Sequence, residues 1–311
     1  MASRVAPAFF LSLMLAGCHG GEAPPTVVIA APVVPTASVA AVASAEANAA
    51  PADGIFVHTA AELVAAFETV ATKGGGTIAL AGGDYHLGRA SFGPSAHIAR
   101  LSSSPDTNPA LVVKGLKKAK LVRQDPGSAP RILTHDRKAR VLTFEGAEDL
   151  VIDGVVSGHD DSTDEVCSAV VFGFEGGRRI TLRNTELFGS GTHGVYLHLV
   201  EDFLMERSKI RSCTQGLVDI DRSKRVLFSN DEMYDTKVSG PLFSVLYSQA
   251  VTVEGCSFHD NAGKAIFQAF ISTGASGGEA ITVRKSTFAN NQTFAFELGP
   301  GQTRASDNVI R

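Results

Sequence analysis

One short pattern recurs six times in the second half of this chain, and it constrains the fold more than any other feature. The six copies are EDLVIDG (148–154), RRITLRN (178–184), EDFLMER (201–207), KRVLFSN (224–230), QAVTVEG (249–255) and EAITVRK (279–285). Their starts are about two dozen residues apart, with variable insertions between them. That period is typical of a solenoid in which each turn holds three short strands joined by turns.

Each copy alternates in polarity. Its third and fifth positions are always apolar, as in Leu150 and Ile152, so one face of the strand is predicted to line a core. The seventh position is Gly or Asn in four copies, and both tolerate positive φ, which predicts a left-handed turn after each strand. Arg207 and Lys285 interrupt this column, and the turn conformation in their coils is left open.

A second column of apolar residues follows each turn, as in Gly194-Val195-Tyr196, and predicts another strand in each coil. Both alternating sets of its residues are largely apolar. The inward and outward sides of this second strand are therefore left open.

Charged residues of the repeats form rows of alternating sign. Strands stacked in adjacent coils are about 4.8 Å apart, so equivalent positions of neighbouring copies should touch. The first position gives Glu148, Arg178, Glu201, Lys224, Gln249 and Glu279, and the second and sixth positions also alternate wherever they are charged. We interpret Glu201, Asp202 and Glu206 as members of ion-pair ladders, each with a basic neighbour one coil away, rather than as catalytic groups. Each exposed pair should contribute about 0 to 1 kcal/mol.

Residues 59–72 are predicted to form a helix that opens the folded domain. Thr59-Ala60-Ala61-Glu62 has the form of a capping box, apolar residues follow at helical spacing, and Gly74-Gly75-Gly76 ends the helix. This entry and the repeats together resemble the right-handed parallel β-helix proteins of the pectate-lyase-like superfamily, in which a short helix plugs the first coil. The resemblance covers residues 55–311 and implies an all-β fold, a right-handed parallel β-helix with a short N-terminal capping helix.

The first eighteen residues are predicted to be a targeting segment. Arg4 precedes an apolar run that is too short to span a bilayer as a mature helix. The run ends in Leu15-Ala16-Gly17-Cys18, which resembles the lipobox of bacterial lipoproteins, whose cysteine is acylated after cleavage. An ordinary secretory signal with a chance cysteine is the alternative. His19 after this cysteine resembles lipoproteins sent to the outer membrane, so we expect a lipid-anchored protein of the cell envelope.

The remaining chain divides into two parts. Residues 19–53 are dominated by Ala, Pro and Val with almost no charge, which is typical of a disordered tether. Residues 54–311 form the predicted β-helix domain. It stops soon after a segment that resembles one more strand and turn, so we expect an open final coil that self-associates or meets a partner.

An acidic insertion lies between Ile152 and Ala169, where the chain is longer than in the next four coils. It reads Gly-His-Asp-Asp-Ser-Thr-Asp-Glu over residues 158–165. Oxygen ligands suit Ca²⁺, so Asp160, Asp161, Asp164 and Glu165 are candidate metal ligands. A solvated acidic loop without an ion is the alternative.

Polar residues just before the second strand are candidate site residues. His193, Gln215 and Lys264 share this coil position, and His193 is predicted to lie one coil from the acidic insertion. A histidine beside carboxylates has a pKa near neutrality and could act as a proton-transfer base. We therefore predict His193 as a catalytic base and His159, Gln215 and Lys264 as substrate contacts. The alternative is that His193 hydrogen-bonds a turn carbonyl.

Function follows less directly than fold. A net charge of −4 with no long basic run argues against nucleic acid binding. The resemblance implies lyases, hydrolases or epimerases of acidic polysaccharides, yet no motif of a single enzyme family is present, and fold does not settle function. Our leading hypothesis is an envelope lipoprotein that binds polysaccharide. The alternatives are a Ca²⁺-assisted lyase or epimerase of uronate polymers near His193, and a structural envelope protein that binds a protein partner.

Overall fold

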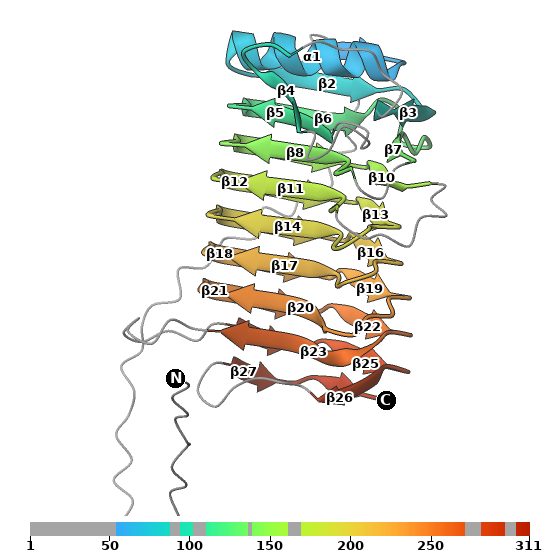
Figure 1. Cartoon of the computed structure of the whole chain (residues 1–311), viewed down its shortest axis with the longest axis vertical. Helices are drawn as coiled ribbons and strands as arrows, with labels where there is room; N and C mark the ends of the chain where they lie inside the picture. Colours follow the sequence, from blue (N-terminus) through green and yellow to red (C-terminus); the bar gives the residue numbers. More distant parts are fainter. Residues whose placement is uncertain are drawn as a thin grey trace, which may run out of the picture. The chain divides into compact units, whose positions relative to one another are not determined.

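The computed structural model describes residues 54–87, 94–101, 110–135, 139–160, 169–270, 281–295 and 303–311. In these residues the chain winds into stacked coils that share three sheets (Figure 1). Among the described strands every pairing between named strands is parallel except that of β4 with β5. Cys18, the tether 19–53 and the acidic residues Asp161, Asp164 and Glu165 lie outside the described residues.

The first sheet contains the sequence repeats. Its ten strands, in spatial order, are β1 (Ile55–Val57), β2 (Gly76–Leu80), β6 (Lys117–Arg123), β9 (Glu148–Asp153), β12 (Arg178–Arg183), β15 (Glu201–Glu206), β18 (Lys224–Ser229), β21 (Gln249–Glu254), β24 (Ile281–Arg284) and β27 (Thr303–Ser306). The six repeats coincide with β9, β12, β15, β18, β21 and β24.

The other two sheets complete each coil. The second sheet consists of β3 (Asp84–His86), β7 (Arg131–Thr134), β10 (Val156–His159), β13 (Glu186–Phe188), β16 (Lys209–Arg211), β19 (Glu232–Tyr234), β22 (Ser257–His259), β25 (Thr287–Ala289) and β28 (Val309–Ile310). The third sheet consists of β4 (Ile98–Leu101), β5 (Ala110–Lys114), β8 (Leu142–Glu145), β11 (Phe172–Glu175), β14 (Val195–His198), β17 (Val218–Asp221), β20 (Pro241–Leu246), β23 (Ala262–Phe270) and β26 (Gln292–Ala295).

The strand register confirms the repeat alignment. Glu201 is opposite Arg178 on one side and opposite Lys224 on the other. The third and fifth repeat positions are at most 1% exposed in all six copies. Phenylalanines stack between coils in the same core, with ring centroids 5.3 Å apart for Phe144 and Phe174. The predicted inward face is therefore confirmed.

Residues at the corners of the coils adopt the left-handed backbone conformation. All six seventh positions have positive φ, including Arg207 (φ 50°) and Lys285 (φ 53°), the two that interrupt the Gly and Asn column. A second left-handed column, which the sequence did not predict, falls on the second repeat position, for example Asp202 (φ 58°) and Ala250 (φ 52°). Stacking of the coils thus imposes a backbone conformation that the local residue type disfavours.

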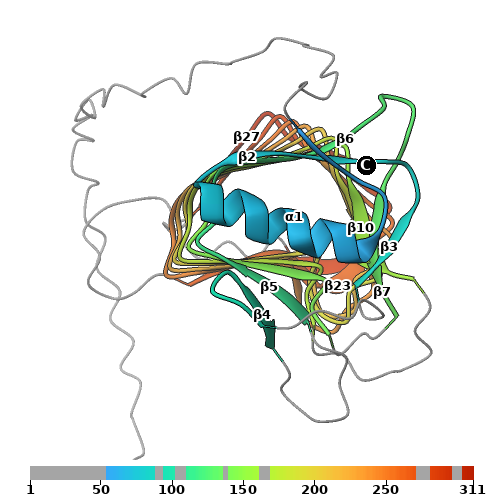
Figure 2. The same ribbon diagram turned by 90° about the horizontal axis from the view of Figure 1, so that it is seen from above.

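Helix α1 (Ala60–Lys73) closes the first coil, within one residue of the predicted bounds. Thr59 Oγ1 accepts a hydrogen bond from the amide of Glu62, which is the first half of the capping box. The Glu62 carboxylate accepts its bond from the amide of His58, the residue before the N-cap. Gly74 ends the helix with φ 75°. Viewed from above, α1 lies across the ring of sheets (Figure 2), with Phe67 against Phe144. Among the described residues no helix is long and apolar enough to cross a bilayer.

The charge ladders form largely as predicted. Arg178 bonds Glu148 at 2.7 Å, Arg183 bonds Asp153 at 2.9 Å, and Arg225 Nη2 lies 2.9 Å from Asp202 and 3.2 Å from Glu201. Glu206 differs from the prediction. Its carboxylate pairs with the adjacent Arg207, at 2.9 Å, while Arg183, the expected partner, bonds Asp153.

Removal of one ladder cation should cost little. Arg225→Gln is expected to lower the free energy of unfolding by less than about 1 kcal/mol, because Arg225, Asp202 and Glu201 have 53%, 43% and 47% exposed side chains. Urea denaturation at low and high salt would measure the loss, which should shrink with salt because exposed charges are screened. A salt-independent loss above 2 kcal/mol would contradict a minor role for these pairs.

A second set of hydrogen bonds links the coils from inside the corner between the first and second sheets. In each step a side chain accepts a hydrogen bond from the backbone amide of the equivalent residue one coil earlier. The series runs through Thr185, Ser208, Asp231, Cys256, Ser286 and Asn308. Its members from Thr185 to Ser286 are at most 2% exposed. Asp231 and Cys256 therefore belong to a buried structural series.

Candidate functional site

His193 lies in the connection between β13 and β14, and its surroundings differ from the prediction. Its ring packs over Gly216, where an added Cβ would come 2.6 Å from His193 Cδ2, so its neighbour is Gly216 rather than Gln215. Its carbonyl oxygen accepts hydrogen bonds from Ser190 Oγ and from the amide of Val171. Burial lowers the pKa of His193 to about 4, whereas a value near neutrality was predicted. The imidazole is consequently neutral at physiological pH.

The three predicted substrate contacts do not converge. His159 is only 4% exposed and its Nε2 donates to the carbonyl oxygen of Ala139, at 2.9 Å. Gln215 is exposed on the connection before β17, with its amide bonded to the carbonyl of Thr192. Lys264 is exposed on β23 and lines a pocket of about 630 Å³ together with Val238, Asn291 and Gln292.

Asp160 is the one predicted metal ligand among the described residues. It follows β10 and meets two imidazoles, those of His86 and His135. These two histidines were missed from the sequence because they lie far apart along the chain, at the ends of β3 and β7. Parallel stacking brings the ends of those strands together.

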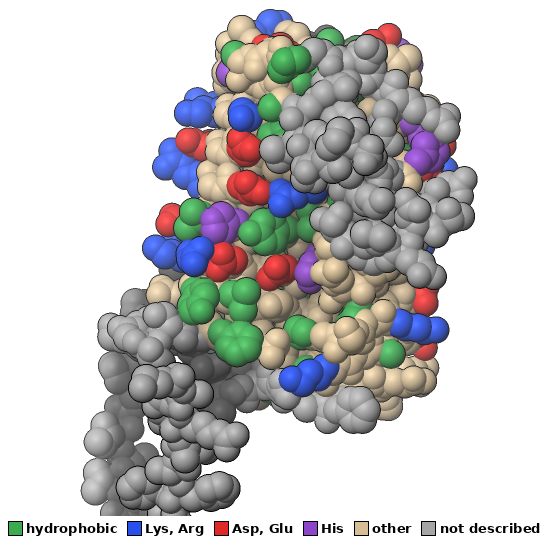
Figure 3. Space-filling model, viewed as in Figure 1, with side chains coloured by type: hydrophobic (Ala, Val, Ile, Leu, Met, Phe, Trp, Pro, Cys, Tyr) green, Lys and Arg blue, Asp and Glu red, His purple; other side chains and the backbone are tan. Residues whose placement is uncertain are grey.

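The outer face of the third sheet carries the functional groups that best suit chemistry on a substrate. On β14 and β17 the inward residues are Val195, Leu197, Val218 and Ile220, and the outward ones are Tyr196, His198, Asp219 and Asp221. This resolves the orientation that the sequence left open. In register, Tyr196 is opposite Asp219 and His198 is opposite Asp221. Figure 3 shows this face, with acidic and histidine side chains above hydrophobic ones.

Asp219 and Asp221 lie on the same side of β17 in different surroundings. Burial raises the pKa of Asp219 to about 6, and the charge of Asp221 adds to this rise. Asp219 Oδ1 is buried and has no hydrogen-bond partner among the described residues. Asp221 Oδ2, in contrast, accepts hydrogen bonds from His198 Nδ1 at 2.9 Å and from Arg222 at 3.2 Å. The raised pKa of Asp219 favours this carboxyl as a proton donor.

Aromatic and basic side chains border the pair. Tyr196 stacks parallel to His198 with ring centroids 6.3 Å apart, and Arg140 lies over the Tyr196 ring while it bonds Glu175. Burial raises the pKa of Tyr196, and the charges of Asp219 and Asp221 contribute. At the carboxyl ends of β14, β20 and β23 in the same sheet, the side chains of Leu199, Tyr247 and Phe270 are about half exposed. The face therefore combines proton-transfer groups with apolar surface that could stack on sugar rings.

The sequence held a signal for this site that the repeat alignment did not use. The segment Val218-Asp219-Ile220-Asp221 alternates strictly between apolar and acidic residues, which identifies the outward side of this strand. The neighbouring coils obscured it, because Gly194-Val195-Tyr196-Leu197 is apolar at nearly every position.

Comparison with known proteins supports the architecture. Residues 165–310 match the sequence family described as "Right handed beta helix region". No curated protein matches this chain. The crystal structure of YbhC from Escherichia coli superposes with a TM-score of 0.54 at 13% identity, over 90% of this chain and 90% of that chain.

Two further solved structures are similar at a lower level. Alginate lyase from Paenibacillus sp. str. FPU-7 superposes with a TM-score of 0.45 at 11% identity, over 83% of this chain and 99% of that chain. Pectin methylesterase from Aspergillus niger superposes with a TM-score of 0.45 at 10% identity, over 84% of this chain and 86% of that chain. The similarity to YbhC, at 13% identity, shows a common fold alone. The predicted right-handed parallel β-helix is confirmed.

Proposed function

For a right-handed parallel β-helix with this outer face, we propose polysaccharide cleavage by general acid–base catalysis at Asp219 and Asp221. The observation that carries the proposal is the pair of outward carboxyls on β17 in opposite electrostatic surroundings. Alternate residues of a strand are about 6.6 Å apart, a spacing that suits two carboxyls acting on one glycosidic bond.

The proposed reaction assigns one role to each carboxyl. Asp219 donates its proton to the glycosidic oxygen as the bond from that oxygen to the anomeric carbon breaks. Asp221 takes a proton from the water whose oxygen attacks the same carbon. The pKa of about 6 keeps a useful fraction of Asp219 protonated near neutral pH, and the hydrogen bonds from His198 and Arg222 hold the Asp221 side chain in position.

The same face supports binding of an extended chain of sugars. Equivalent strands repeat about every 4.8 Å, so the face extends along several coils beside Asp219 and Asp221. Tyr196 and the half-exposed Tyr247 and Phe270 provide ring faces for stacking. We further propose that acylated Cys18 anchors the protein to the cell envelope, on the periplasmic or outward side of the outer membrane, with residues 19–53 as the spacer.

Replacement of the proposed acid should separate turnover from binding. Asp219→Asn is expected to lower turnover about 100-fold while binding changes less than about threefold, because general acid catalysis typically contributes 10²–10⁴-fold. The substrate panel should include neutral and uronate polysaccharides, with reducing ends as the readout. The limb of the wild-type pH–rate profile near pH 6 should disappear in the variant.

The matched control is Asp235→Asn, an exposed carboxyl after β19 in the second sheet, which should behave like wild type. Equal turnover by Asp219→Asn and wild type would overturn the proposed acid. Binding by the wild-type protein without any turnover would support a polysaccharide-binding protein and contradict the proposed enzymatic activity. Absence of binding across the panel would favour the structural protein with a protein partner.

Elimination or epimerisation on a uronate is a second candidate, in which the neutral imidazole of His193 would take the proton, as a base weakened by its pKa of about 4. A cation such as Ca²⁺ at the acidic insertion would neutralise the uronate carboxylate in this scheme. β-Elimination produces an unsaturated sugar that absorbs in the ultraviolet, whereas hydrolysis does not. If the protein forms an ultraviolet-absorbing product, and if His193→Ala or a chelator abolishes it, elimination would be favoured over hydrolysis.

A further inference from the structure

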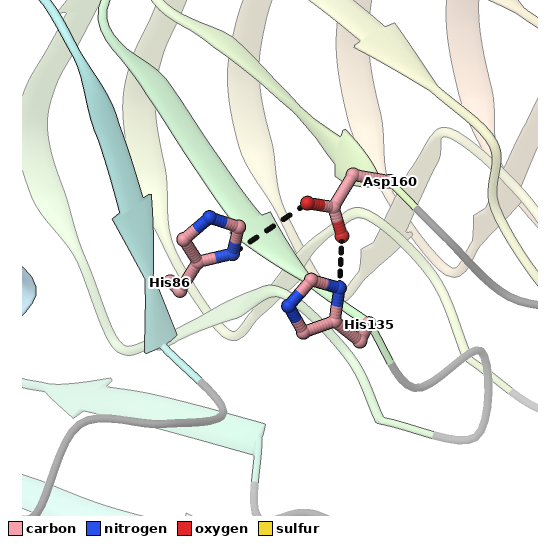
Figure 4. A group of neighbouring side chains, drawn as sticks. All are labelled: His86, His135 and Asp160. Atoms are coloured by element: carbon pink, nitrogen blue, oxygen red, sulfur yellow. Dashed lines mark ion pairs between the residues drawn. The ribbon is translucent and has the colours of Figure 1, made fainter.

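A cluster of potential metal ligands lies on the second sheet, apart from the strands that carry Asp219 and Asp221. His86 is the last residue of β3, His135 directly follows β7, and Asp160 directly follows β10. These three strands are neighbours in one sheet. Figure 4 shows the two imidazoles stacked beside the Asp160 carboxylate, with ring centroids 4.8 Å apart and an interplanar angle of 20°.

The ligand atoms are close together. His135 Nδ1 lies 2.8 Å from Asp160 Oδ1, and His86 Nδ1 lies 3.5 Å from Asp160 Oδ2. One ligand atom from each of the three residues can be chosen so that all lie within 4.8 Å of one another. Three ligands about 2.1 Å from a tetrahedral ion are roughly 3.4 Å apart, so small side-chain rotations would complete the geometry.

Hydrogen bonding does not account for the cluster. His86 Nδ1, His135 Nε2 and Asp160 Oδ1 are buried and have no hydrogen-bond partner among the described residues. The 2.8 Å approach of His135 to Asp160 is therefore short without being aligned as a hydrogen bond. Buried polar atoms are nearly always satisfied, and three unsatisfied atoms in one group of three residues require an explanation.

The charge of Asp160 also favours a bound cation. The Asp160 side chain is only 14% exposed. Within the described residues its ion-pair partners are the two histidines, and neither Lys nor Arg contacts it. A bound cation would neutralise this carboxylate and satisfy the imidazole lone pairs together.

We propose that His86, His135 and Asp160 bind one divalent transition-metal ion of the Zn²⁺ class. Two imidazole nitrogens and one carboxylate oxygen are a ligand set for Zn²⁺ or related ions, whereas Ca²⁺ takes six to eight oxygen ligands. Three protein ligands leave a coordination position for water. Because the ligands come from three successive coils, the ion joins the ends of β3, β7 and β10.

Titration of the chelator-treated full chain with Zn²⁺, followed by calorimetry, tests the site. We expect one equivalent to bind with a Kd of about 1 μM or tighter, and saturating Zn²⁺ to raise the melting temperature by several degrees. His86→Ala, His135→Ala and Asp160→Asn should each weaken binding at least tenfold. Co²⁺ should give a visible absorption band that each substitution removes.

His58→Gln is the matched control, because His58 is exposed at the start of α1 and should leave Zn²⁺ affinity unchanged. Circular dichroism without metal shows whether each variant is folded, and the Co²⁺ band reports on ligation independently of stability. Unchanged Zn²⁺ affinity in folded variants of all three residues would overturn the proposal. His259 pairs with Glu232 and Asp260 elsewhere in the protein, so loss of Zn²⁺ binding in His259→Ala alone would also overturn the proposal. Tighter binding of Ca²⁺ than of Zn²⁺ would overturn it as well.

Discussion

Gly158→Ala is expected to destabilise the β-helix by at least about 4 kcal/mol, at the upper end for single substitutions. A Cβ at Gly158 would lie 2.3 Å from the carbonyl oxygen of Phe188 and 2.7 Å from its ring. The carbonyl belongs to β13, the strand paired with β10, so relief would require the two coils to move apart. The φ of Gly158 is not in the left-handed region, and the expected loss is purely steric.

Thermal and urea denaturation would measure this effect. Gly127→Ala is the control, because nothing lies within 4 Å of a Cβ there and its φ is also ordinary. That variant should stay within about 0.5 kcal/mol of wild type or gain slightly from reduced freedom of the unfolded chain. Equal stability of Gly158→Ala and wild type would show that the coils are not packed as closely as described.

The second large effect is a pH dependence that arises from Asp231. This carboxyl is 2% exposed, and burial raises its pKa to about 8 from the ordinary 3.8. Between these pH values the folded protein retains a proton that the unfolded chain has released. The contribution of this carboxyl to stability is therefore complete near pH 4 and is lost as pH rises through 8, by roughly 6 kcal/mol at most. Amides of Ser208 and Ser229 bond the carboxyl and reduce the loss.

Asp231→Asn removes the titrating group and should flatten the stability curve between pH 5 and 9. The variant should match wild type near pH 5 and exceed it by several kcal/mol at pH 9. Urea denaturation at intervals of pH would measure this, and Asp235→Asn, which is exposed, should follow wild type. Parallel curves for Asp231→Asn and wild type would contradict the raised pKa. Carboxylates held by arginines, such as Asp202, act at lower pH, because their pKa is lowered.

The fold was predictable from the sequence because every coil of the solenoid needs the same pattern of buried apolar and exposed polar positions. Leu150, Phe203 and Val251 occupy one buried position, and a single strand of this chain would not have revealed that position as clearly as six do. The charge rows added an independent test of register, since Glu201 needed a basic neighbour on each side. The helix was predictable from its N-terminal cap, the helical spacing of its apolar residues and the glycines that end it.

The candidate site was less predictable because it depends on residues that do not repeat. Asp219 and Asp221 occur in one coil. Recognising them as outward residues required the orientation of β17, which the largely apolar residues of the neighbouring strand β14 did not reveal. His86 and Asp160 are 74 positions apart and belong to different coils, so no sequence spacing connects them. His193 was misjudged because its burial depends on packing against a glycine of the next coil.

Substitutions at the left-handed corners could increase the stability of this fold. Residues such as Lys118 and Ala250 hold a conformation that costs an L-residue about 1 kcal/mol, and the same corner recurs in coil after coil. Replacement of several by Gly or Asn would accumulate small gains that affect neither the core nor the third-sheet face. In an evolving lineage that margin could absorb destabilising changes at Asp219 or Asp221, so that new specificities arise without collapse of the scaffold.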